Sequence, residues 1–383
     1  MHGWAGTQYE TRMASGNGRL RSPGGRVHSV DMEVIRSNMQ RSCHVCGSVG
    51  EVVYSGLEDR LFKAPGAWDL KRCLNRDCGL IWLDPAPCPA DIHKAYANYY
   101  THRDGAASRS LLQVVKEKAK RGYRARKFAF EADKATALDY LLGFVIGLLW
   151  PGREYLDYGF AQLADLEKGR LLEIGCGKGH LLALMSRWGW ACEGLDFDDT
   201  AVGNARQKGL KVVLGDLESQ RYPEGKFDAI LSSHVIEHVT DPKALVTECL
   251  RVLRPGGRCI VVTPNVLAWS HRLFGRHWRG LEPPRHLHLF APQSLRNLVA
   301  SCGAEDIRMT ASARIASRIF CDSLGSCLDS GTRHRPWYTL LGEATHVIEW
   351  GLMKTALAST NEMICVFHRP LPGTSASTAA SNQ

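Results

Sequence analysis

Four cysteines near the N-terminus are the residues whose types and spacing most directly suggest chemistry. Cys43 and Cys46 form a C-x2-C pair, and Cys73 and Cys78 form a C-x4-C pair after 26 intervening residues. Two such pairs can supply four thiolates in a tetrahedron, which is the geometry of structural zinc sites. All four ligands would be protein atoms, so we expect a closed structural Zn2+ site without an open catalytic position. The alternative interpretation is four free thiols.

A second pattern combines an acid, three glycines and an apolar strand. The segment 171–179 reads L-L-E-I-G-C-G-K-G and continues into an apolar helical stretch, Leu181 to Trp188. Glycines in a strand-to-helix turn permit positive φ angles and let a ligand approach the backbone closely. A glycine triplet alone is weak evidence, because dinucleotide-binding enzymes use a related loop.

Two acids follow at the ends of the next two predicted strands. Asp196 stands in G-L-D, about twenty residues beyond the glycines, where a carboxylate can accept hydrogen bonds from ribose hydroxyls. Asp216 stands in G-D-L about twenty residues later, where it can accept from an adenine amino group while Leu217 packs against the ring. Either aspartate alone could be a helix N-cap or a turn residue. Their common register with the glycine loop favours a nucleoside-binding site.

Histidines supply the candidate bases, because the ordinary pKa of histidine, about 6.5, lies close to working pH. His238 follows the fourth predicted strand, and His286 and His288 occur in P-P-R-H-L-H-L-F. If that segment is extended, His286 and His288 point to the same side. The alternative is that these histidines only hydrogen-bond to the backbone.

The elements that must position these residues alternate between strands and helices. Apolar or β-branched runs occur at 170–174, 191–196, 211–214, 228–232 and 258–263, with helical stretches between them. This alternation is typical of βαβ units in a parallel sheet that is covered on both faces. The sequence therefore predicts an α/β domain.

The motifs E-I-G-C-G-K-G, G-L-D, G-D-L, F-D-A-I-L-S-S-H-V-I-E-H-V-T-D-P and L-R-V-L-R-P-G-G together resemble class I S-adenosylmethionine (SAM) dependent methyltransferases. The resemblance is dense from Gly169 to Asn265. It implies a Rossmann-like, seven-stranded and mostly parallel sheet, with Glu362 to His368 as the antiparallel last strand. By position, it assigns contacts with SAM to residues in these motifs: Glu173, Gly175, Cys176, Gly177, Gly179, Asp196, Phe197, Asp216, Leu217, Ser233 and His234.

The stretch H-L-H-L-F-A-P-Q-S-L-R-N-L-V resembles the region after strand five in sugar methyltransferases that carry an N-terminal cysteine unit. In that subgroup a histidine in E-H-L-x-x-F serves as the base, and it matches His286. Arg285 stands in place of the glutamate, which departs from the C-methylation pattern of the subgroup. The cysteine unit and the tyrosines after it resemble the zinc module of the same enzymes, which implies that Tyr96, Tyr99 and Tyr100 face the acceptor pocket.

Five regions follow from these patterns. We expect a disordered extension at 1–38, a zinc-binding module at 39–100, a helical linker or lid at 101–152, a methyltransferase domain at 153–370 and a disordered tail at 371–383. The net charge is +9, and residues 101–135 hold ten Lys or Arg against four Asp or Glu. A localised basic helix is usually a solvated face, so nucleic acid is disfavoured as a partner.

The leading hypothesis is methyl transfer to a small-molecule acceptor, foremost a hydroxyl of a sugar or another secondary metabolite. The alternatives are a nucleic-acid methyltransferase, and a non-catalytic, zinc-dependent interaction protein. The first residues lack the apolar core of a secretory signal, so we expect a cytoplasmic protein. The apolar run Tyr140 to Trp150 is too short to span a bilayer. It predicts a packed core or lid helix, or alternatively a peripheral membrane contact beside the basic helix.

Overall fold

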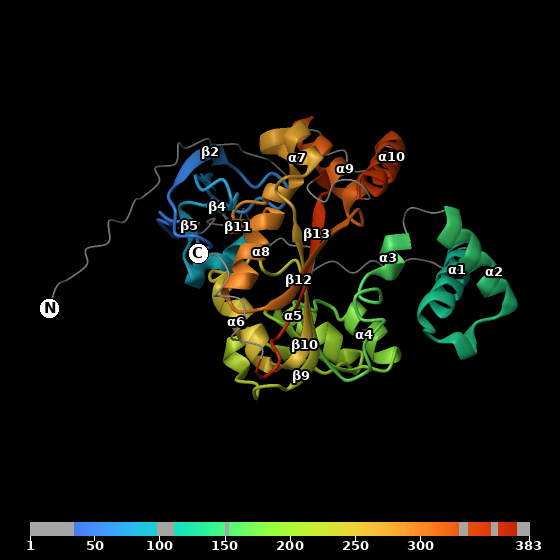
Figure 1. Ribbon diagram of the computed structural model, residues 1–383. Coiled ribbons are helices and arrows are strands. Elements are labelled where there is room, and N and C mark those ends of the chain that lie inside the picture. The colour runs from blue at the N-terminus through green and yellow to red at the C-terminus, as the bar shows by residue number, and fades with distance from the viewer. Residues whose placement is uncertain (1–33, 98–110, 150–152, 329–335, 354–358, 374–383) are drawn as a thin grey trace, which may run out of the picture.

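A seven-stranded sheet forms the centre of the molecule (Figure 1), and its strand order is β12-β13-β10-β9-β6-β7-β8. The structure is a computed structural model that describes residues 34–97, 111–149, 153–328, 336–353 and 359–373. β13 is antiparallel to both of its neighbours, and the remaining neighbours pair in parallel. The predicted Rossmann-like fold is confirmed, including its antiparallel last strand. The strands are β6 (Arg170–Ile174), β7 (Ala191–Asp196), β8 (Val212–Leu214), β9 (Phe227–Ser233), β10 (Leu253–Pro264), β12 (Glu305–Ser312) and β13 (Glu362–His368).

The central strands are buried on both faces, because successive side chains point to opposite sides of a strand. Leu172 and Ile230 pack into a core shared with two helices, α6 and α8. Leu171 and Ala229 pack into a second core, which α4 helps to cover. Burial on both faces explains why these strands read as nearly continuous apolar runs. The helices flanking the sheet are α4 (His180–Arg187), α5 (Asp199–Gln207), α6 (Pro242–Val252) and α8 (Pro292–Ser301).

The N-terminal unit contains a second sheet, in the order β11-β4-β3-β2. Its strands are β2 (Gly50–Leu57), β3 (Trp68–Cys73), β4 (Ile81–Leu83) and β11 (His288–Leu289). β11 belongs to the later part of the chain and pairs antiparallel with β4, so the predicted methyltransferase region supplies one strand of the cysteine unit's sheet. Two short strands, β1 (Ser37–Asn38) and β5 (Ala86–Pro87), pair with each other, so the last two residues of the expected N-terminal extension form a strand.

A buried ion pair also joins the N-terminal unit to the sheet domain. Arg285, which is fully buried, donates from Nη1 to Asp59 Oδ2 at 2.8 Å and from Nε to Glu282 Oε1 at 2.9 Å. The same Nη1 donates to Ala95 O at 2.8 Å. The arginine that replaces the expected glutamate is therefore a structural link between the two parts of the chain.

The remaining helices lie outside the central sheet. The predicted helical linker consists of α1 (Leu111–Phe128) and α2 (Ala137–Leu149), which stand beside the sheet domain (Figure 1). The others are α3 (Glu154–Asp157), α7 (Trp269–Phe274), α9 (Ala316–Cys327) and α10 (Pro336–Leu352). No helix in the described parts of the chain combines the length and the apolar character needed to cross a bilayer.

Candidate active site and cysteine cluster

The loop after β6 carries three glycines with positive φ angles. Gly175, Gly177 and Gly179 have φ values of 71°, 53° and 72°, a region that residues with a Cβ rarely adopt. A Cβ at Gly175 would lie 2.4 Å from Val235 Cγ2, and one at Gly179 would lie 2.3 Å from Leu210 Cδ1. At Gly177 a Cβ would meet nothing within 4 Å. The loop is thus tightly packed at its flanking glycines and leaves the backbone of Gly177 open to a ligand.

Asp196, at the end of β7, holds this open glycine in place. Gly177 N donates to Asp196 Oδ2 at 2.7 Å, and Asp198 N donates to Oδ1 at 2.9 Å. Burial raises the pKa of the Asp196 carboxyl above its usual value. Cys176, between two of the glycines, is buried, and its N–H donates to Leu195 O at 3.1 Å. Carboxylate oxygens have further lone pairs, so Asp196 can still accept from hydroxyls of a ligand on the loop.

Glu173 is buried in β6 just before the loop, and burial raises the pKa of its carboxyl to about 8. Its Oε2 has no hydrogen-bond partner among the described residues. An unpartnered buried polar atom is uncommon and costs about 1–3 kcal/mol. The position therefore fits a ligand that brings a hydrogen-bond donor, such as an amino group.

The second predicted acid lies in a turn after β8. Asp216 is exposed, and its Oδ1 accepts from Ser219 N at 2.8 Å. Leu217 beside it is buried in the core. Asp216 therefore already stabilises a local turn, and its second oxygen remains available to a ligand.

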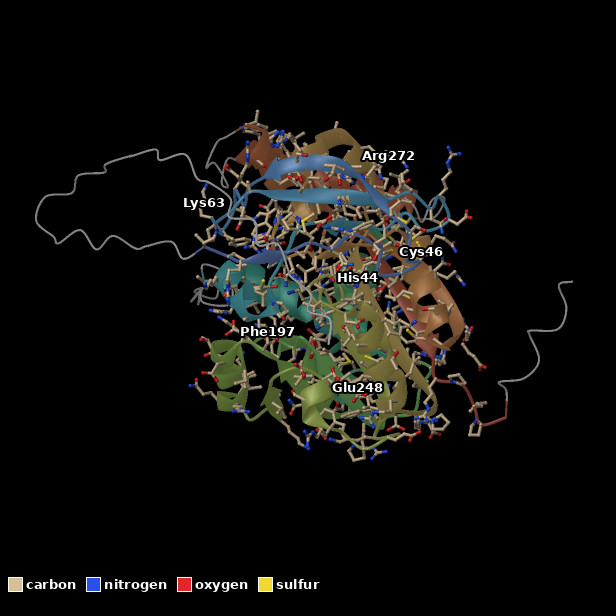
Figure 2. The ribbon with its side chains drawn as sticks, turned by 90° about the vertical axis from the view of Figure 1, so that its left-hand side faces the viewer. His44, Cys46, Lys63, Phe197, Glu248 and Arg272 are labelled. Carbon is tan, nitrogen blue, oxygen red and sulfur yellow. The ribbon has the colours of Figure 1, made fainter. Side chains whose placement is uncertain are left out.

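Phe197, directly after β7, is 62% exposed and lies against the N-terminal unit. Its ring centroid is 5.2 Å from that of Tyr96. Figure 2 shows Phe197 and His44 where the N-terminal unit meets the sheet domain, and His44 contacts His288 there at a centroid distance of 4.6 Å. Of the three predicted acceptor-facing tyrosines, Tyr99 and Tyr100 lie outside the described residues.

A network of charged side chains begins at the end of β9. β6 and β9 pair in parallel with Ile174 opposite Ser232, which brings Ser233 and His234 beside the glycine loop. His234 Nδ1 lies 3.1 Å from Glu237 Oε1, and its Nε2 lies 2.8 Å from Glu362 Oε1. Although burial opposes the charged ring, these carboxylates raise the pKa of His234 to about 9. His234 is therefore protonated at neutral pH.

His238 and His286 face each other, with ring centroids 4.7 Å apart. His238 Nδ1 lies 3.0 Å from Arg285 O and 3.0 Å from Tyr96 Oη, and His286 Nδ1 lies 2.7 Å from Gly280 O. A carbonyl oxygen can only accept, so Nδ1 carries a proton in both rings. The neutral tautomer that matches this arrangement has its free lone pair on Nε2, which is the atom that a base requires.

The histidine pair adjoins the buried carboxylate of Glu237. Burial lowers the pKa of His286 to about 4, so this ring is neutral near pH 7. Ligand atoms of Glu237, His238 and His286 all lie within 4.8 Å of one another, a spacing at which they could also hold a metal ion. However, Glu237 already contacts His234 and accepts from Thr263 Oγ1 at 3.0 Å. Although burial opposes its ionisation, His234 lowers the pKa of Glu237 to about 2.

His288 does not join this pair. The N–H groups of Arg285 and His286 donate to Glu282 O at 2.9 and 3.1 Å, which places His286 in a turn after two prolines. The segment is extended only from His288 onward, where β11 begins. The two histidines consequently do not share one face, and His288 packs against His44 of the N-terminal unit.

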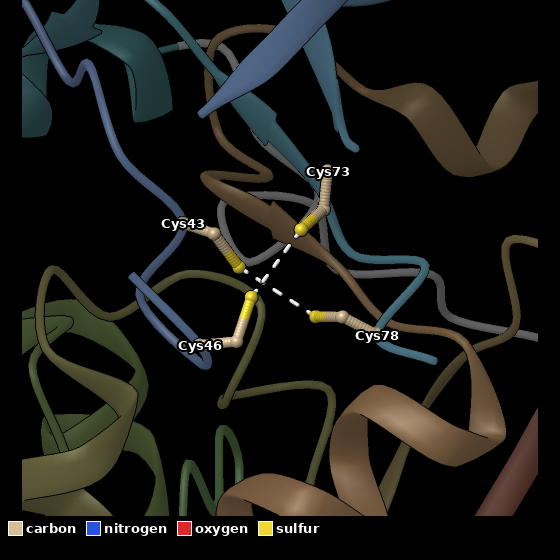
Figure 3. A group of neighbouring side chains, drawn as sticks. All are labelled: Cys43, Cys46, Cys73 and Cys78. Carbon is tan, nitrogen blue, oxygen red and sulfur yellow. Dashed lines mark hydrogen bonds between the residues drawn. The ribbon is translucent and has the colours of Figure 1, made fainter. Parts of the chain in front are cut away.

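The four cysteines of the N-terminal unit converge on one point (Figure 3). Cys43 Sγ lies 3.6 Å from Cys78 Sγ, Cys46 Sγ lies 3.4 Å from Cys73 Sγ, and all four sulfurs lie within 4.8 Å of one another. A disulfide would require about 2.05 Å. Four thiolates about 2.3 Å from a central ion in a tetrahedron lie about 3.8 Å apart. The cluster thus has the size and the donor set of a four-thiolate metal site.

Comparison with known proteins identifies the sheet domain. Residues 152–309 match the family described as methyltransferase domain. This segment is a methyltransferase domain. It contains every predicted SAM-contacting residue and all three candidate histidines, whereas the cysteine unit precedes it.

Two curated relatives and one solved structure illustrate the similarity. A "Probable S-adenosylmethionine-dependent methyltransferase" of Mycolicibacterium smegmatis is 37% identical over 114 residues, which are 29% of this chain and 44% of the relative. A "Ubiquinone biosynthesis O-methyltransferase" of Xanthomonas oryzae pv. oryzae is 38% identical over 117 residues, 29% of this chain and 48% of the relative. The chain thus spans less than half the length of these relatives. A SAM-dependent methyltransferase structure from Archaeoglobus fulgidus has 18% identity and a TM-score of 0.38, covering 60% of this chain and 99% of that one.

Three residues of the charged network near the methyltransferase domain's glycine loop were missed by sequence reasoning. Glu237 stands within the quoted V-I-E-H-V motif, and Glu362 opens an otherwise apolar strand. Glu362 could have been noticed in the sequence, because a charged residue at the start of a buried strand is unusual. Arg314, which donates to Glu362 Oε1 at 2.6 Å, follows no pattern that would have singled it out.

Proposed function

We propose that the chain is a SAM-dependent methyltransferase that methylates a hydroxyl of a small molecule, such as a sugar or another secondary metabolite. The observation that carries this proposal is the open backbone of Gly177, held by Asp196 beside the unpartnered oxygen of Glu173. A SAM molecule has the groups that this arrangement lacks, an ammonium for Glu173 and ribose hydroxyls for Asp196.

The residues around the loop then have distinct roles. Glu173 and the three glycines hold the methionine portion, Asp196 holds the ribose, and Asp216 with Leu217 holds the adenine. The other proposed SAM contacts are Cys176, Phe197, Ser233 and His234. SAM supplies a methyl group on a sulfonium, and the protein mainly has to align that group with the acceptor, since orientation alone can contribute about 7–11 kcal/mol.

We assign proton removal to the histidine pair. His286 Nε2 is the first candidate because its ring is neutral and its Nδ1 proton is fixed by Gly280 O. His238 is the second candidate, oriented by Arg285 O and Tyr96. His288 was a third candidate, but its contact with His44 supports a structural role. We favour proton transfer over metal binding at this cluster because Glu237 is already paired with the cationic His234.

Two observations support a hydroxyl acceptor. The Xanthomonas relative is named an O-methyltransferase. Arg285, in place of the glutamate of the C-methylating subgroup, is committed to a buried ion pair with Asp59 and Glu282. The four-cysteine cluster is proposed to bind one structural zinc ion, because its donors are all thiols and its size fits a tetrahedral site.

The experiment combines SAM binding with methyl transfer. Calorimetry should detect SAM binding by the full chain, and Gly177→Arg and Asp196→Ala should abolish it or weaken it strongly. Glu224→Ala, at an exposed ion pair with Arg369, is the control. Radiolabelled SAM should then transfer its methyl group to a hydroxylated small molecule from a panel of phenols and nucleotide sugars, and not to tRNA or DNA. Absent SAM binding would refute the enzyme assignment, and label in nucleic acid would refute the acceptor class.

A further inference from the structure

Helix α2 buries a charged residue and a glycine together with the half-buried Leu142 and Ile146, and it exposes its other large apolar residues. The residues facing α1 include Asp139 and Gly143, which are buried. A Cβ at Gly143 would lie 2.2 Å from Tyr123 N, and one at Gly122 of α1 would lie 1.7 Å from Asp139 O. The two helices therefore cross in direct backbone contact, which only small residues permit. Such contacts are characteristic of helix pairs in apolar surroundings.

The outer side of α2 is a continuous apolar stripe. Its members recur three or four residues apart, so they share one face of the helix. They are Leu138, Leu141, Phe144, Val145 and Leu148, with exposed fractions of 50%, 60%, 46%, 45% and 67%. In an ordinary surface helix an outward face of this kind would be polar, so the exposed apolar face of α2 is unusual.

Helix α10 also exposes several large apolar residues. Its buried residues include Gly342, Thr345, His346 and Glu349. Its exposed apolar residues are Leu340, Leu341, Val347 and Ile348, with exposed fractions of 73%, 42%, 52% and 53%. The outer side of α10 also exposes Glu343, so it is less uniformly apolar than that of α2.

The two helices lie on the same side of the molecule (Figure 1) and are linked through Arg153. Arg153 Nη1 donates to Gly147 O in α2 at 2.7 Å, and its guanidinium lies 5.4 Å from the ring of Trp350 in α10. Arg153 therefore bridges the C-terminal ends of α2 and α10.

Positive charge accompanies the stripe of α2. α1 carries one glutamate, Glu117, and the cations Lys116, Lys118, Lys120, Arg121, Arg124, Arg126 and Lys127. The guanidinium of Arg126 lies 4.7 Å from the ring of Phe144, within the stripe itself. Apolar side chains bordered by Lys and Arg match the two layers of a lipid surface, an acyl boundary below anionic headgroups.

We propose that the outer face of α2 is a docking surface for an anionic lipid bilayer. α2 lies flat in the interface with its exposed leucines and Phe144 in the acyl boundary, while exposed cations of α1 such as Lys116 and Arg126 contact lipid phosphates. This proposal does not depend on the methyl-transfer activity, because none of these residues belongs to the proposed SAM or acceptor site.

The test is flotation of the full chain with lipid vesicles. Vesicles of phosphatidylcholine with about 30% phosphatidylglycerol should retain at least about tenfold more protein than pure phosphatidylcholine, and high salt should reduce binding, since screening weakens attraction to headgroups. The double variant Leu141→Glu, Phe144→Glu should lose at least about tenfold of the binding. Leu273→Glu is the matched control, because Leu273 is an equally exposed leucine on α7, at 59%. Thermal unfolding of all variants verifies that they are folded.

Three results would overturn the proposal. The first is no binding to anionic vesicles at low salt, and the second is equal binding by the double variant and the parent protein. The third is that light scattering shows a dimer for the parent protein and a monomer for the double variant, while neither of the two binds vesicles. That result would assign the stripe to contact with a second copy of the chain.

Discussion

Glu173 and His286 are both buried, and burial moves their pKa values in opposite directions. It raises that of Glu173 to about 8 and lowers that of His286 to about 4. Desolvation disfavours the charged form of either group. Both side chains are consequently neutral near pH 7 in the unliganded protein, which leads to two different pH dependences.

Glu173 should couple SAM binding to the release of a proton. Below about pH 8 the folded, unliganded protein holds a proton on Glu173, and a cationic ligand favours the carboxylate. SAM affinity should therefore increase from pH 6 to 8, by at most about tenfold per pH unit. Calorimetry across this range measures the effect. In the absence of SAM, the raised pKa of Glu173 should lower the free energy of unfolding as pH rises from about 4.5 to 8, because this carboxyl ionises first in the unfolded chain.

The control for this linkage is Glu173→Gln, which keeps the shape of the side chain and cannot ionise. Its SAM affinity should be lower than that of the parent protein at pH 8 and less dependent on pH. Equal pH profiles for the two proteins would show that Glu173 does not contact the ligand's charge.

His286→Ala should lower kcat by about 100- to 10,000-fold and leave SAM affinity nearly unchanged, because a general base typically contributes that much to the rate. With a pKa of about 4, His286 is already deprotonated at pH 5.5. At saturating SAM, the kcat/KM of the parent enzyme for the acceptor should therefore stay flat from about pH 5.5 to 7, whereas an ordinary histidine would titrate near 6.5. Steady-state kinetics over this range measures both effects.

His238→Ala is the comparison for this prediction. A loss of kcat larger than that in His286→Ala, with SAM affinity unchanged, would assign the base to His238 instead. The lowered pKa of His286 also makes the free energy of unfolding depend on pH. Its contribution is complete above pH 6.5 and is lost as pH falls toward 4, because the ring is protonated first in the unfolded chain.

The contacts of these residues were only partly predictable. The positions of Gly177 and Asp196 followed from motif spacing, because the ends of neighbouring parallel strands meet at one edge. The approach of His286 to His238 did not follow, because it depends on a turn at Glu282 that separates His286 from β11. Local spacing carries no information about such a change of direction.

Among the elements, the cysteine unit gives the clearest prediction. Purified, metal-replete protein should contain about one zinc per chain, and Cys73→Ser should lose it and unfold the N-terminal unit, because zinc binding contributes to folding. Metal analysis and the fluorescence of the buried Trp82 measure the two effects. Cys88→Ser is the matched control, since Cys88 lies in the same unit but outside the cluster.

Less than about half an equivalent of zinc in the parent protein would contradict the four-thiolate assignment. So would a Cys73→Ser variant that retains the full metal content. Loss of zinc in Cys88→Ser as well would indicate that the unit is unstable in general, and that Cys73 is not specifically a ligand.

The helices show where sequence patterns stop being informative. The length and apolar character of α2 were evident from the run beginning at Tyr140. Its exposed apolar face was not, because periodicity reveals that a helix has an apolar face but not which face the rest of the protein covers. The close crossing at Gly122 and Gly143 sets which side of α2 lies against α1.

Across the whole molecule, the ion pair of Arg285 with Asp59 should contribute strongly to the joint stability of the two parts. Asp59→Ala leaves a fully buried guanidinium without one of its partners. Removing one partner of a buried pair typically lowers the free energy of unfolding by about 3–5 kcal/mol. Urea denaturation followed by tryptophan fluorescence measures this change.

Glu224→Ala provides the comparison, because Glu224 pairs with Arg369 at the surface. Surface pairs contribute about 0–1 kcal/mol, so this variant should unfold close to the parent protein. Equal effects of the two substitutions would show that Arg285 does not hold the N-terminal unit and the sheet domain together.

The pairing of β11 with β4 has a consequence for how this chain could have been assembled or could be re-engineered. A segment cut after the cysteine unit would end with β4 as an unpaired edge, and exposed edges invite pairing with other chains. The cysteine unit is therefore not an independent module that can be transferred to another enzyme by a fusion at a linker. Any transplant must carry the downstream turn and β11 along with it, so the two stretches of sequence are expected to be inherited, lost and redesigned together.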